Sequence, residues 1–496
     1  MPSKQILLPS HRDLYYGGSW HRPKSAGYYE LTSPGSGESL GVAADGSAAD
    51  VDAAVSSARA AFAAWRNVAP LDRAKALRRF AAIVREHARE LAMLDAIDCG
   101  NPVRAMVGDA EVAAAQIDFF AGLVTEMKGA SIPMGPGRMN VSVREPLGVV
   151  ARIIPFNHPF MFAAGKSAAP LAAGNTIVVK PPEQAPLSAL RLTELVEDVF
   201  PPGVFNVVTG AGRDTGAALV AHRGVAKVAL IGSVAAGRAV MRNASETIKP
   251  VLLELGGKNA LIAFPDANPA EVADAMIAGM NFAWCGQSCG STSRAFLHAA
   301  IHDRVLDEVR ARIGAFRPGL PDDWETTMGA IVNRAQYDRI LSHIETAKKD
   351  GATLVCGGGV PSAQALAGGL FIEPTVFADV TPAMTIAREE IFGPVLSVLK
   401  WTDEASMIRD VNSLDVGLTC SIWTKDIDAA MRTAHAAEAG FVWINEVSRH
   451  FLGAPFGGVK QSGLGREECL EELIAFTHEK NIHVRFAEAP GERAGL

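Results

Sequence analysis

The sequence predicts an α/β protein organised around a doubly wound parallel sheet. Between residues 149 and 256, short apolar strands rich in β-branched residues alternate with helices in the order βαβαβαβαβ, from VVARIIP to VLLELGG. Strands of this kind are typical of a parallel sheet with helices on both faces, and such sheets bind ligands at the carboxyl ends of their strands. A second α/β pattern fills the C-terminal half, and a chain of 496 residues has room for two or three domains.

Composition narrows the classes of protein and partner. The chain is 48% hydrophobic and 20% charged, and no apolar run approaches the roughly 20 residues of a membrane-spanning helix. The first residues, MPSKQILLPS, lack the apolar core of a secretory signal, so we expect a cytoplasmic protein. A net charge of −7 with interspersed signs predicts neither a nucleic-acid nor a membrane partner. Six scattered cysteines predict neither disulfides nor a metal site.

The N-terminal segment predicts a strand followed by helices. The strand is expected at YYELTSP. Residues 48–98, which are alanine-rich, predict two long amphipathic helices, and residues 111–127 predict a third. After a Gly/Pro-rich linker, RMNVSVREP alternates like an exposed strand, and FTHEKNIHVRF near the C-terminus does the same. These two segments predict a small protruding sheet whose edges another subunit covers.

Two residues are the leading candidates for chemistry. The segment GQSCGS displays Cys289 between small residues, which leaves the thiol open to a carbonyl carbon. Glu254 ends the apolar run KPVLLEL and precedes two glycines, as in a strand that delivers a carboxylate to the rim of a sheet. Taken singly, each has an ordinary alternative, because most cysteines are small buried hydrophobes and most strand-end glutamates are solvated.

Other polar residues follow the ends of neighbouring strands. The amide of Asn157, in PFNHPF, is placed either to face an oxyanion or to cap a helix. Lys180 and Glu183, in VVKPPEQAP, can bond ribose hydroxyls. The usual GxGxxG motif is missing, but GSVAAG at 232–237 joins a strand to a helix. The amides of that turn either meet a pyrophosphate or form an ordinary turn capped by Ser233.

Seven motifs, in order across almost the whole chain, resemble the aldehyde dehydrogenase superfamily: PFNHP, KPPEQAP, GS-x-x-x-G, LELGGKN, GQSC, EEIFGP and PFGGVKQSGLGRE. The resemblance implies an NAD(P)-dependent enzyme with Cys289 as nucleophile, Glu254 as general base, Asn157 as oxyanion donor and Lys166 as a supporting lysine. The cofactor contacts that it implies are Ile154, Lys180, Glu183, Gly212, Gly232, Ser233, Gly237, Leu255, Glu390 and Phe392.

The resemblance also divides the chain. It implies a Rossmann-like cofactor-binding domain of residues 1–127 and 148–256, a second α/β catalytic domain of residues 257–456, and a small β oligomerisation arm of residues 128–147 and 470–488. The arm implies a homodimer or a homotetramer. We expect NAD rather than NADP, because a carboxylate at Glu183 can chelate ribose hydroxyls and would repel a 2′-phosphate.

Alignment of the motifs predicts the walls of a substrate tunnel: His158, Phe162, Gly165, Trp284, Cys285, Ser288 and His450. None is a lysine or arginine, so a carboxylate on the substrate would enter unpaired. Gly165 replaces a bulky residue of the family and should widen the tunnel. We therefore expect medium-sized apolar or aromatic aldehydes as substrates, with a quaternary ammonium aldehyde as the main competitor because Trp284 offers a cation–π surface.

The expected reaction oxidises an aldehyde to a carboxylic acid through a thiohemiacetal and a thioester on Cys289, with Glu254 activating the hydrolytic water. Three alternatives stay open. A coenzyme A-acylating enzyme would use the same cysteine without needing Glu254. A cofactor-free thioesterase would not need Lys180 or Glu183. A non-catalytic family member would have no reason to keep Cys289, Glu254 and Asn157 together.

Overall fold

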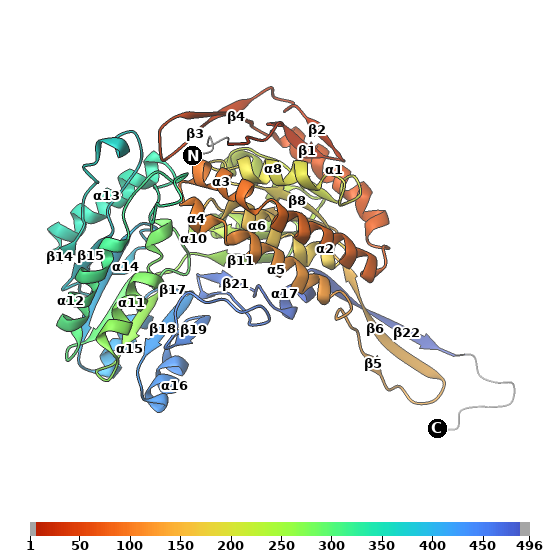
Figure 1. Ribbon diagram of the computed structural model, residues 1–496. Helices are drawn as coiled ribbons and strands as arrows, with labels where there is room; N and C mark the ends of the chain where they lie inside the picture. The colour runs from red at the N-terminus through yellow and green to blue at the C-terminus, as the bar shows by residue number, and fades with distance from the viewer. Residues whose placement is uncertain (1–5, 487–496) are drawn as a thin grey trace.

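The computed structural model describes residues 6–486 and contains two large sheets, each covered by helices (Figure 1). The first sheet has the order β2-β1-β9-β8-β7-β10-β11-β21, with β7 to β11 parallel and the outer strands antiparallel. Its strands are β1 (Leu14–Tyr16), β2 (Ser19–His21), β7 (Val149–Ile153), β8 (Thr176–Lys180), β9 (Phe205–Val207), β10 (Val225–Gly232), β11 (Val251–Leu255) and β21 (Gly463–Leu464).

The predicted doubly wound topology is confirmed by this strand order. The chain winds from β7 to β8 and β9 in one direction, then returns to the other side of β7 to form β10 and β11. Alternate residues of β7 enter different cores, because Val150 packs on one face and Val149 and Ala151 on the other. Ligands bind such sheets where the strand order reverses, which here is the carboxyl edge of β7 and β10.

The helices around this sheet form two layers. The face that carries Val150 is covered mainly by α2, α5, α7 and α8, and the opposite face by α1, α9 and α10. The helices of this half are α1 (Ala48–Trp65), α2 (Pro70–Glu86), α3 (Ala88–Cys99), α4 (Val103–Met106), α5 (Asp109–Gly122), α6 (Pro159–Gly165), α7 (Ala168–Ala172), α8 (Leu187–Val196), α9 (Ala217–Ala221) and α10 (Val234–Ser245).

The two long helices predicted for residues 48–98 are three in the structure. The first is α1, which begins with a capping box between Ser47 and Asp50. The second is broken at His87, whose backbone leaves the helical region at φ −99° and ψ 17°, so that α2 ends and α3 begins there. The His87 ring bonds the Glu90 carboxylate at 2.9 Å. The apolar spacing continues through the break, which is why the sequence pattern did not reveal it.

The second sheet is also mostly parallel, with the order β14-β15-β16-β13-β12-β18-β19. Its strands are β12 (Ala260–Ala263), β13 (Arg294–His298), β14 (Thr353–Cys356), β15 (Thr375–Ala378), β16 (Val395–Trp401), β18 (Thr419–Trp423) and β19 (Phe441–Ile444). Its helices are α11 (Pro269–Gly279), α12 (His302–Arg312), α13 (Arg334–Lys349), α14 (Thr385–Arg388), α15 (Glu404–Asn412) and α16 (Ile427–Ala436).

Three smaller sheets complete the fold. The strand predicted at YYELTSP is β3 (Tyr28–Thr32), which pairs with β4 (Ser39–Ala44), and β17 (Val416–Gly417) pairs with β20 (Val459–Lys460). The segments RMNVSVREP and FTHEKNIHVRF form β6 (Arg138–Pro146) and β22 (Thr477–Arg485). They pair antiparallel over their whole length, with β5 (Ser131–Ile132) on the other side of β6. This arm projects from the body (Figure 1).

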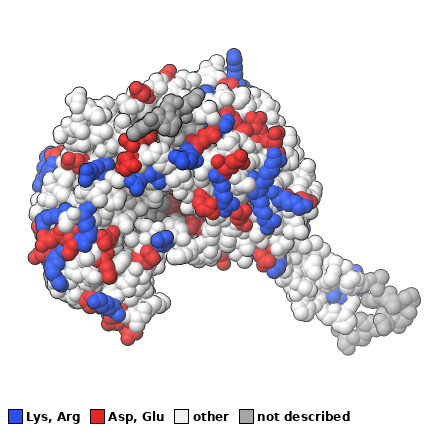
Figure 2. Space-filling view, in the orientation of Figure 1, with Lys and Arg blue, Asp and Glu red and all other residues white. Residues whose placement is uncertain are grey.

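Phe476 belongs to the body rather than to the arm. Its side chain is 0% exposed and packs in the core of the first sheet, after the short helix α17 (Leu470–Ala475). Residues 1–5 of the predicted first domain and residues 487–488 of the predicted arm lie outside the described residues. Within residues 6–486, no helix combines the length and the apolar character needed to span a bilayer. Basic and acidic side chains intermingle over the body in Figure 2.

Candidate active site

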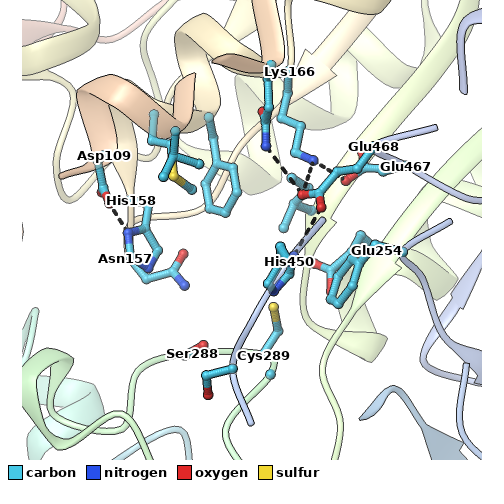
Figure 3. Close-up of a pocket in the computed structure, with 18 of the residues that line it drawn as sticks. Asp109, Asn157, His158, Lys166, Glu254, Ser288, Cys289, His450, Glu467 and Glu468 are labelled. Atoms are coloured by element: carbon cyan, nitrogen blue, oxygen red, sulfur yellow. Dashed lines mark hydrogen bonds and ion pairs between the residues drawn. The ribbon is translucent and has the colours of Figure 1, made fainter. Parts of the chain in front are cut away.

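A cavity of about 520 Å³ lies at the carboxyl edge of the first sheet, between the two sheets. Cys289, Glu254, Asn157 and Lys166, which are far apart in sequence, all line it. In Figure 3 the Cys289 sulfur points toward Glu254 and His450, while Asn157 and His158 lie on the opposite wall. The four residues that the motifs predict as catalytic are therefore neighbours in one cavity.

The loop that carries Cys289 has a fixed backbone. It follows a 3₁₀ turn at Phe282–Trp284, which is flanked by Asn281 and Cys285, both in the left-handed region at φ 56° and 55°. The side chain of Asn259 donates to the carbonyl of Cys289 at 2.7 Å. Burial raises the pKa of the Cys289 thiol, and the charge of Glu254 and its hydrogen bond with the thiol raise it further. The resting sulfur is thus a protonated thiol that needs a base.

Glu254 is placed to be that base. It lies near the end of β11, is only 4% exposed, and its Oε1 has no hydrogen-bond partner among residues 6–486. Burial raises the pKa of this carboxyl to about 8, with Glu467 as the second cause, although the hydrogen bond with Cys289 and the charge of Lys166 oppose the rise. A carboxyl that titrates near neutral pH can both accept and release a proton.

Asn157 follows β7, and a hydrogen bond to its backbone carbonyl fixes its position. The amide of Asn101 donates to the Asn157 carbonyl at 2.7 Å, so the side chain is directed from a fixed point. The side chain is 3% exposed, and within the described part of the chain neither its Oδ1 nor its donor Nδ2 makes a hydrogen bond. An amide that lines the cavity and is not used by the protein can donate to an oxygen that develops negative charge.

Lys166 is locked into a buried network of charges. Its ammonium lies 3.0 Å from Glu467 and 3.3 Å from Glu468, and Glu467 also pairs with the fully buried Arg152 at 2.8 Å. Burial alone would lower the pKa of Lys166, but the carboxylates around it, which include Glu472, hold that pKa above its ordinary value. Lys166 therefore stays charged. Its positive charge lowers the pKa of Glu254, and the network of glutamates in Figure 3 fixes its position.

The sequence reasoning did not single out Glu467 and Glu468, although both line the cavity. A signal existed, because acidic residues in GREECLEEL share a segment with buried apolar positions. Although burial opposes it, Lys166 and His450 lower the pKa of Glu468 to about 2. Its carboxylate bonds His450 at 3.1 Å and accepts from Gln116 at 3.3 Å. Glu468 thus links the buried lysine to the rim of the cavity.

The predicted cofactor residues at the end of β8 fit a ribose. Lys180 is 3% exposed, and its ammonium has no hydrogen-bond or ion-pair partner within residues 6–486. Burial lowers its pKa to about 8, and the charges of Glu183 and Asp45 oppose that effect. The Glu183 carboxylate accepts from the Gly212 amide at 2.6 Å and stays partly exposed. An unpaired buried ammonium beside a carboxylate is suited to vicinal hydroxyls.

The other predicted cofactor residues fall into two groups. At the end of β10 and the start of α10, Gly232 has no atom within 3.4 Å of an added Cβ, and Ser233 caps the helix through Ala236 at 3.2 Å. At Gly237 an added Cβ would lie 2.5 Å from Leu255. The contact of Gly237 with the cofactor stays a prediction. The small size of Gly237 lets α10 pack against β11.

Glu390 and Phe392 reach the same edge from the second sheet. Glu390 accepts from the Gly257 amide at 3.1 Å, and burial raises the pKa of its carboxyl to about 7. Phe392 has a positive φ of 54° and packs edge-to-face on Phe156 at 5.7 Å. Ile154 and Leu255 are buried in the two cores beside this edge, at 3% and 5% exposure.

Five of the predicted tunnel residues line the cavity: His158, Phe162, Trp284, Ser288 and His450. Gly165 does not, because Gln116 fills the space beside it and an added Cβ would lie 2.3 Å from Gln116 Oε1. Cys285 does not either, because its side chain is 0% exposed in the core of the second sheet. The predictions that Gly165 widens the tunnel and that Cys285 lines it are wrong.

The seven predicted wall residues include no lysine or arginine, but the lining of the cavity does contain cations. Besides the paired Lys166, Arg449 lines the cavity from the loop after β19. Asp109 is a further residue that the sequence reasoning missed, and it bonds the His158 ring at 2.7 Å. Neither residue lies in a recognisable motif, and both reach the cavity only through the packing of distant segments.

The model of the aldehyde dehydrogenase family matches residues 20–482. The chain belongs to this family. Among relatives, the dehydrogenase is similar to aldehyde dehydrogenase tropH of Talaromyces stipitatus, with 52% identity over 98% of this chain and 96% of that one. It is 40% identical to betaine aldehyde dehydrogenase of Brucella melitensis, over 96% of this chain and 97% of that one.

Solved structures of the family superpose on the dehydrogenase closely. An NAD⁺ complex of aldehyde dehydrogenase from Bacillus cereus has a TM-score of 0.94 and 37% identity, covering 98% of this chain and 99% of that one. PnpE from Pseudomonas sp. WBC-3 has a TM-score of 0.94 and 38% identity, covering 97% and 98%. The resemblance given by the seven motifs is thus confirmed, and with it the assignment as an aldehyde dehydrogenase.

Proposed function

We propose that this dehydrogenase uses NAD to oxidise an aldehyde to a free carboxylic acid by way of a thioester on Cys289. The observation that carries the proposal is that the Cys289 thiol, the Glu254 carboxyl and the Asn157 amide, which are far apart in sequence, line one cavity. A nucleophile, its base and an oxyanion donor are the parts that acyl chemistry on a cysteine requires.

The first step forms a bond between the Cys289 sulfur and the carbonyl carbon. Glu254 takes the thiol proton, and the carbonyl oxygen becomes an oxyanion. The Asn157 amide and the Cys289 backbone N–H hold that oxyanion, and loss of one such donor typically costs about 10²–10³ in rate. The buried ammonium of Lys166 favours the ionised form of Glu254 and so helps it to act as a base.

The second half of the reaction releases the acid. When bound, NAD supplies the acceptor for the hydride that leaves the substrate carbon. Glu254 first releases the thiol proton to solvent. The ionised carboxylate then removes a proton from water, the hydroxide attacks the thioester carbon, and the carbon–sulfur bond breaks to give the acid and a thiolate, which takes back the proton from Glu254. Glu254 distinguishes this route from transfer to coenzyme A, which does not need a base for water.

Lys180 and Glu183 would hold the adenosine ribose, and the opening at Gly232 and Ser233 would accept the pyrophosphate at the start of α10. Glu390 and Phe392 would approach the nicotinamide half from the second sheet. NAD is preferred to NADP because Glu183 lies where a 2′-phosphate would bring a second negative charge. The NAD⁺ complex of the related Bacillus cereus enzyme supports NAD as a cofactor.

The proposal extends to the organisation of the chain. Residues 148–256 and the segment before residue 128 form the cofactor-binding domain, and residues 257–456 form the catalytic domain. The arm consists of residues 128–147 and the C-terminal strand β22, because residues 470–476 pack with the body. The open edges of the arm carry exposed apolar side chains such as Ile132 and Ile482, and a second subunit would cover them in a homodimer or homotetramer. The enzyme acts in the cytoplasm, where its thiols remain reduced.

The decisive experiment compares two cysteines. Cys289→Ser abolishes aldehyde-dependent formation of NADH without coenzyme A, because an alcohol is a poor nucleophile at neutral pH. Cys285→Ser is the matched control, since Cys285 is fully buried outside the cavity, and it retains turnover. Loss of activity in Cys285→Ser together with activity in Cys289→Ser would refute the proposal.

A further inference from the structure

The cavity contains one cation that no carboxylate neutralises. Lys166 pairs with Glu467 and Glu468, and the rings of His158 and His450 bond Asp109 and Glu468. The guanidinium of Arg449 has neither an ion-pair nor a hydrogen-bond partner within residues 6–486, although it lines the same cavity. Arg449 is therefore the cation of the cavity lining that has no carboxylate partner among the described residues.

The loop that carries Arg449 is held in place. The Trp443 indole of β19 donates to the Arg449 carbonyl at 2.8 Å, and Ser448 adopts a left-handed conformation at φ 56°. Ser448 also lines the cavity, and its buried hydroxyl has no hydrogen-bond partner among the described residues. A guanidinium and a free hydroxyl that line one cavity are both suitable groups for binding a carboxylate.

Much of the remaining cavity wall is apolar. Phe162, Trp284, Leu452 and Phe456 line the cavity, and Trp284 packs edge-to-face on His158 at 4.6 Å. The interior thus suits a flat or unsaturated carbon skeleton. A quaternary ammonium group would gain a cation–π contact at Trp284, but it would also be repelled by Arg449.

We propose that Arg449 and Ser448 bind a carboxylate carried by the aldehyde substrate at the end opposite its carbonyl. The preferred substrate class is then a medium-sized semialdehyde of a dicarboxylic acid, with an apolar or aromatic middle. This inference rests on the proposed aldehyde oxidation, and it replaces the expectation of an uncharged substrate. Arg449 is exposed, but it can still select such a substrate. The protein around a bound ligand strengthens the pairing of its carboxylate with the guanidinium, and because the carboxylate keeps part of its hydration, the cost of desolvation stays small.

The test uses a pair of aldehydes that differ only in charge, 4-formylbenzoate and its methyl ester. The ratio of their kcat/KM values with NAD measures the preference for a carboxylate. We expect the wild-type enzyme to prefer the acid, and Arg449→Met to reduce the ratio by about tenfold. Arg449→Lys should restore part of the ratio, and Arg449→Glu should shift the preference toward betaine aldehyde.

Arg223→Met serves as the matched control, because Arg223 is exposed and lies outside the cavity. It should keep the wild-type ratio. An unchanged ratio in Arg449→Met, or a wild-type preference for the ester, would overturn the inference while leaving aldehyde oxidation intact. Formation of NADH from none of the aldehydes would instead overturn the proposed function, and the inference with it.

Discussion

The pH dependence of turnover tests the role of Glu254 directly. Only the ionised carboxylate can take a proton from the thiol or from water, and its pKa is about 8. The ionised fraction is therefore about one tenth at pH 7, one half at pH 8 and nine tenths at pH 9. We expect kcat/KM for the aldehyde at saturating NAD to rise by about tenfold from pH 7 to pH 9 and then to level off.

Neighbouring charges provide the control for this assignment. Among neighbouring charges, that of Glu467 raises the pKa of Glu254 most. Glu467→Gln should therefore move the rising limb of the profile to lower pH. Because Glu467 also pairs with Lys166 and Arg152, thermal unfolding should be measured on the same variant. A profile that stays flat from pH 6 to pH 9 in the wild type, or a limb that Glu467→Gln leaves unmoved, would refute the reasoning.

Glu254→Gln should slow hydrolysis more than acylation, so that an acyl adduct on Cys289 appears by intact mass after mixing with aldehyde and NAD; a variant that forms NADH without an adduct would contradict this. Glu183→Ser should narrow the preference for NAD over NADP, measured as the ratio of their kcat/KM values, and a wild type that prefers NADP would refute it. Truncation after Phe476 should yield monomers, as measured by light scattering, whereas an oligomer of the wild-type size would show that the arm does not hold the subunits together. Gly165→Ala should lower Tm, because the new Cβ must displace Gln116 at a cost of about 1–3 kcal/mol, while Gly122→Ala, with nothing within 4 Å, should not.

The sequence predicted the parts of this molecule that depend on local pattern. The alternating strands of the first sheet are confirmed by the structure, because each strand carries its own apolar and β-branched signal. Cys289 and Glu254 could be proposed because glycine-rich turns fix how the backbone presents them. Arg449 could not, because nothing in its loop reveals that Trp443 anchors it beside the cavity.

Gly165 illustrates the opposite limit. Alignment predicted an enlarged tunnel at that position, since a small residue replaces a bulky one. Which neighbour fills the vacated space depends on side chains from other helices, and here Gln116 of α5 occupies it. The same helix contributes Asp109 to the cavity, so its contacts with α6 decide features that no single segment encodes.

The position of Glu467, Glu468 and Glu472 in the chain bears on the order in which the enzyme can mature. Arg152 and Lys166 emerge from the ribosome some three hundred residues before the carboxylates that neutralise them. Until the last segment docks, these two cations have no carboxylate partners. Burying them unpaired costs free energy, so the N-terminal half alone should not fold stably around them. The same final segment continues through Phe476 into β22, which pairs with the waiting β6. The ion pairs of Arg152 and Lys166 and the β6–β22 sheet of the arm thus form together, late in folding. A nascent chain therefore cannot offer the arm to another subunit before the charges beside the active site are paired.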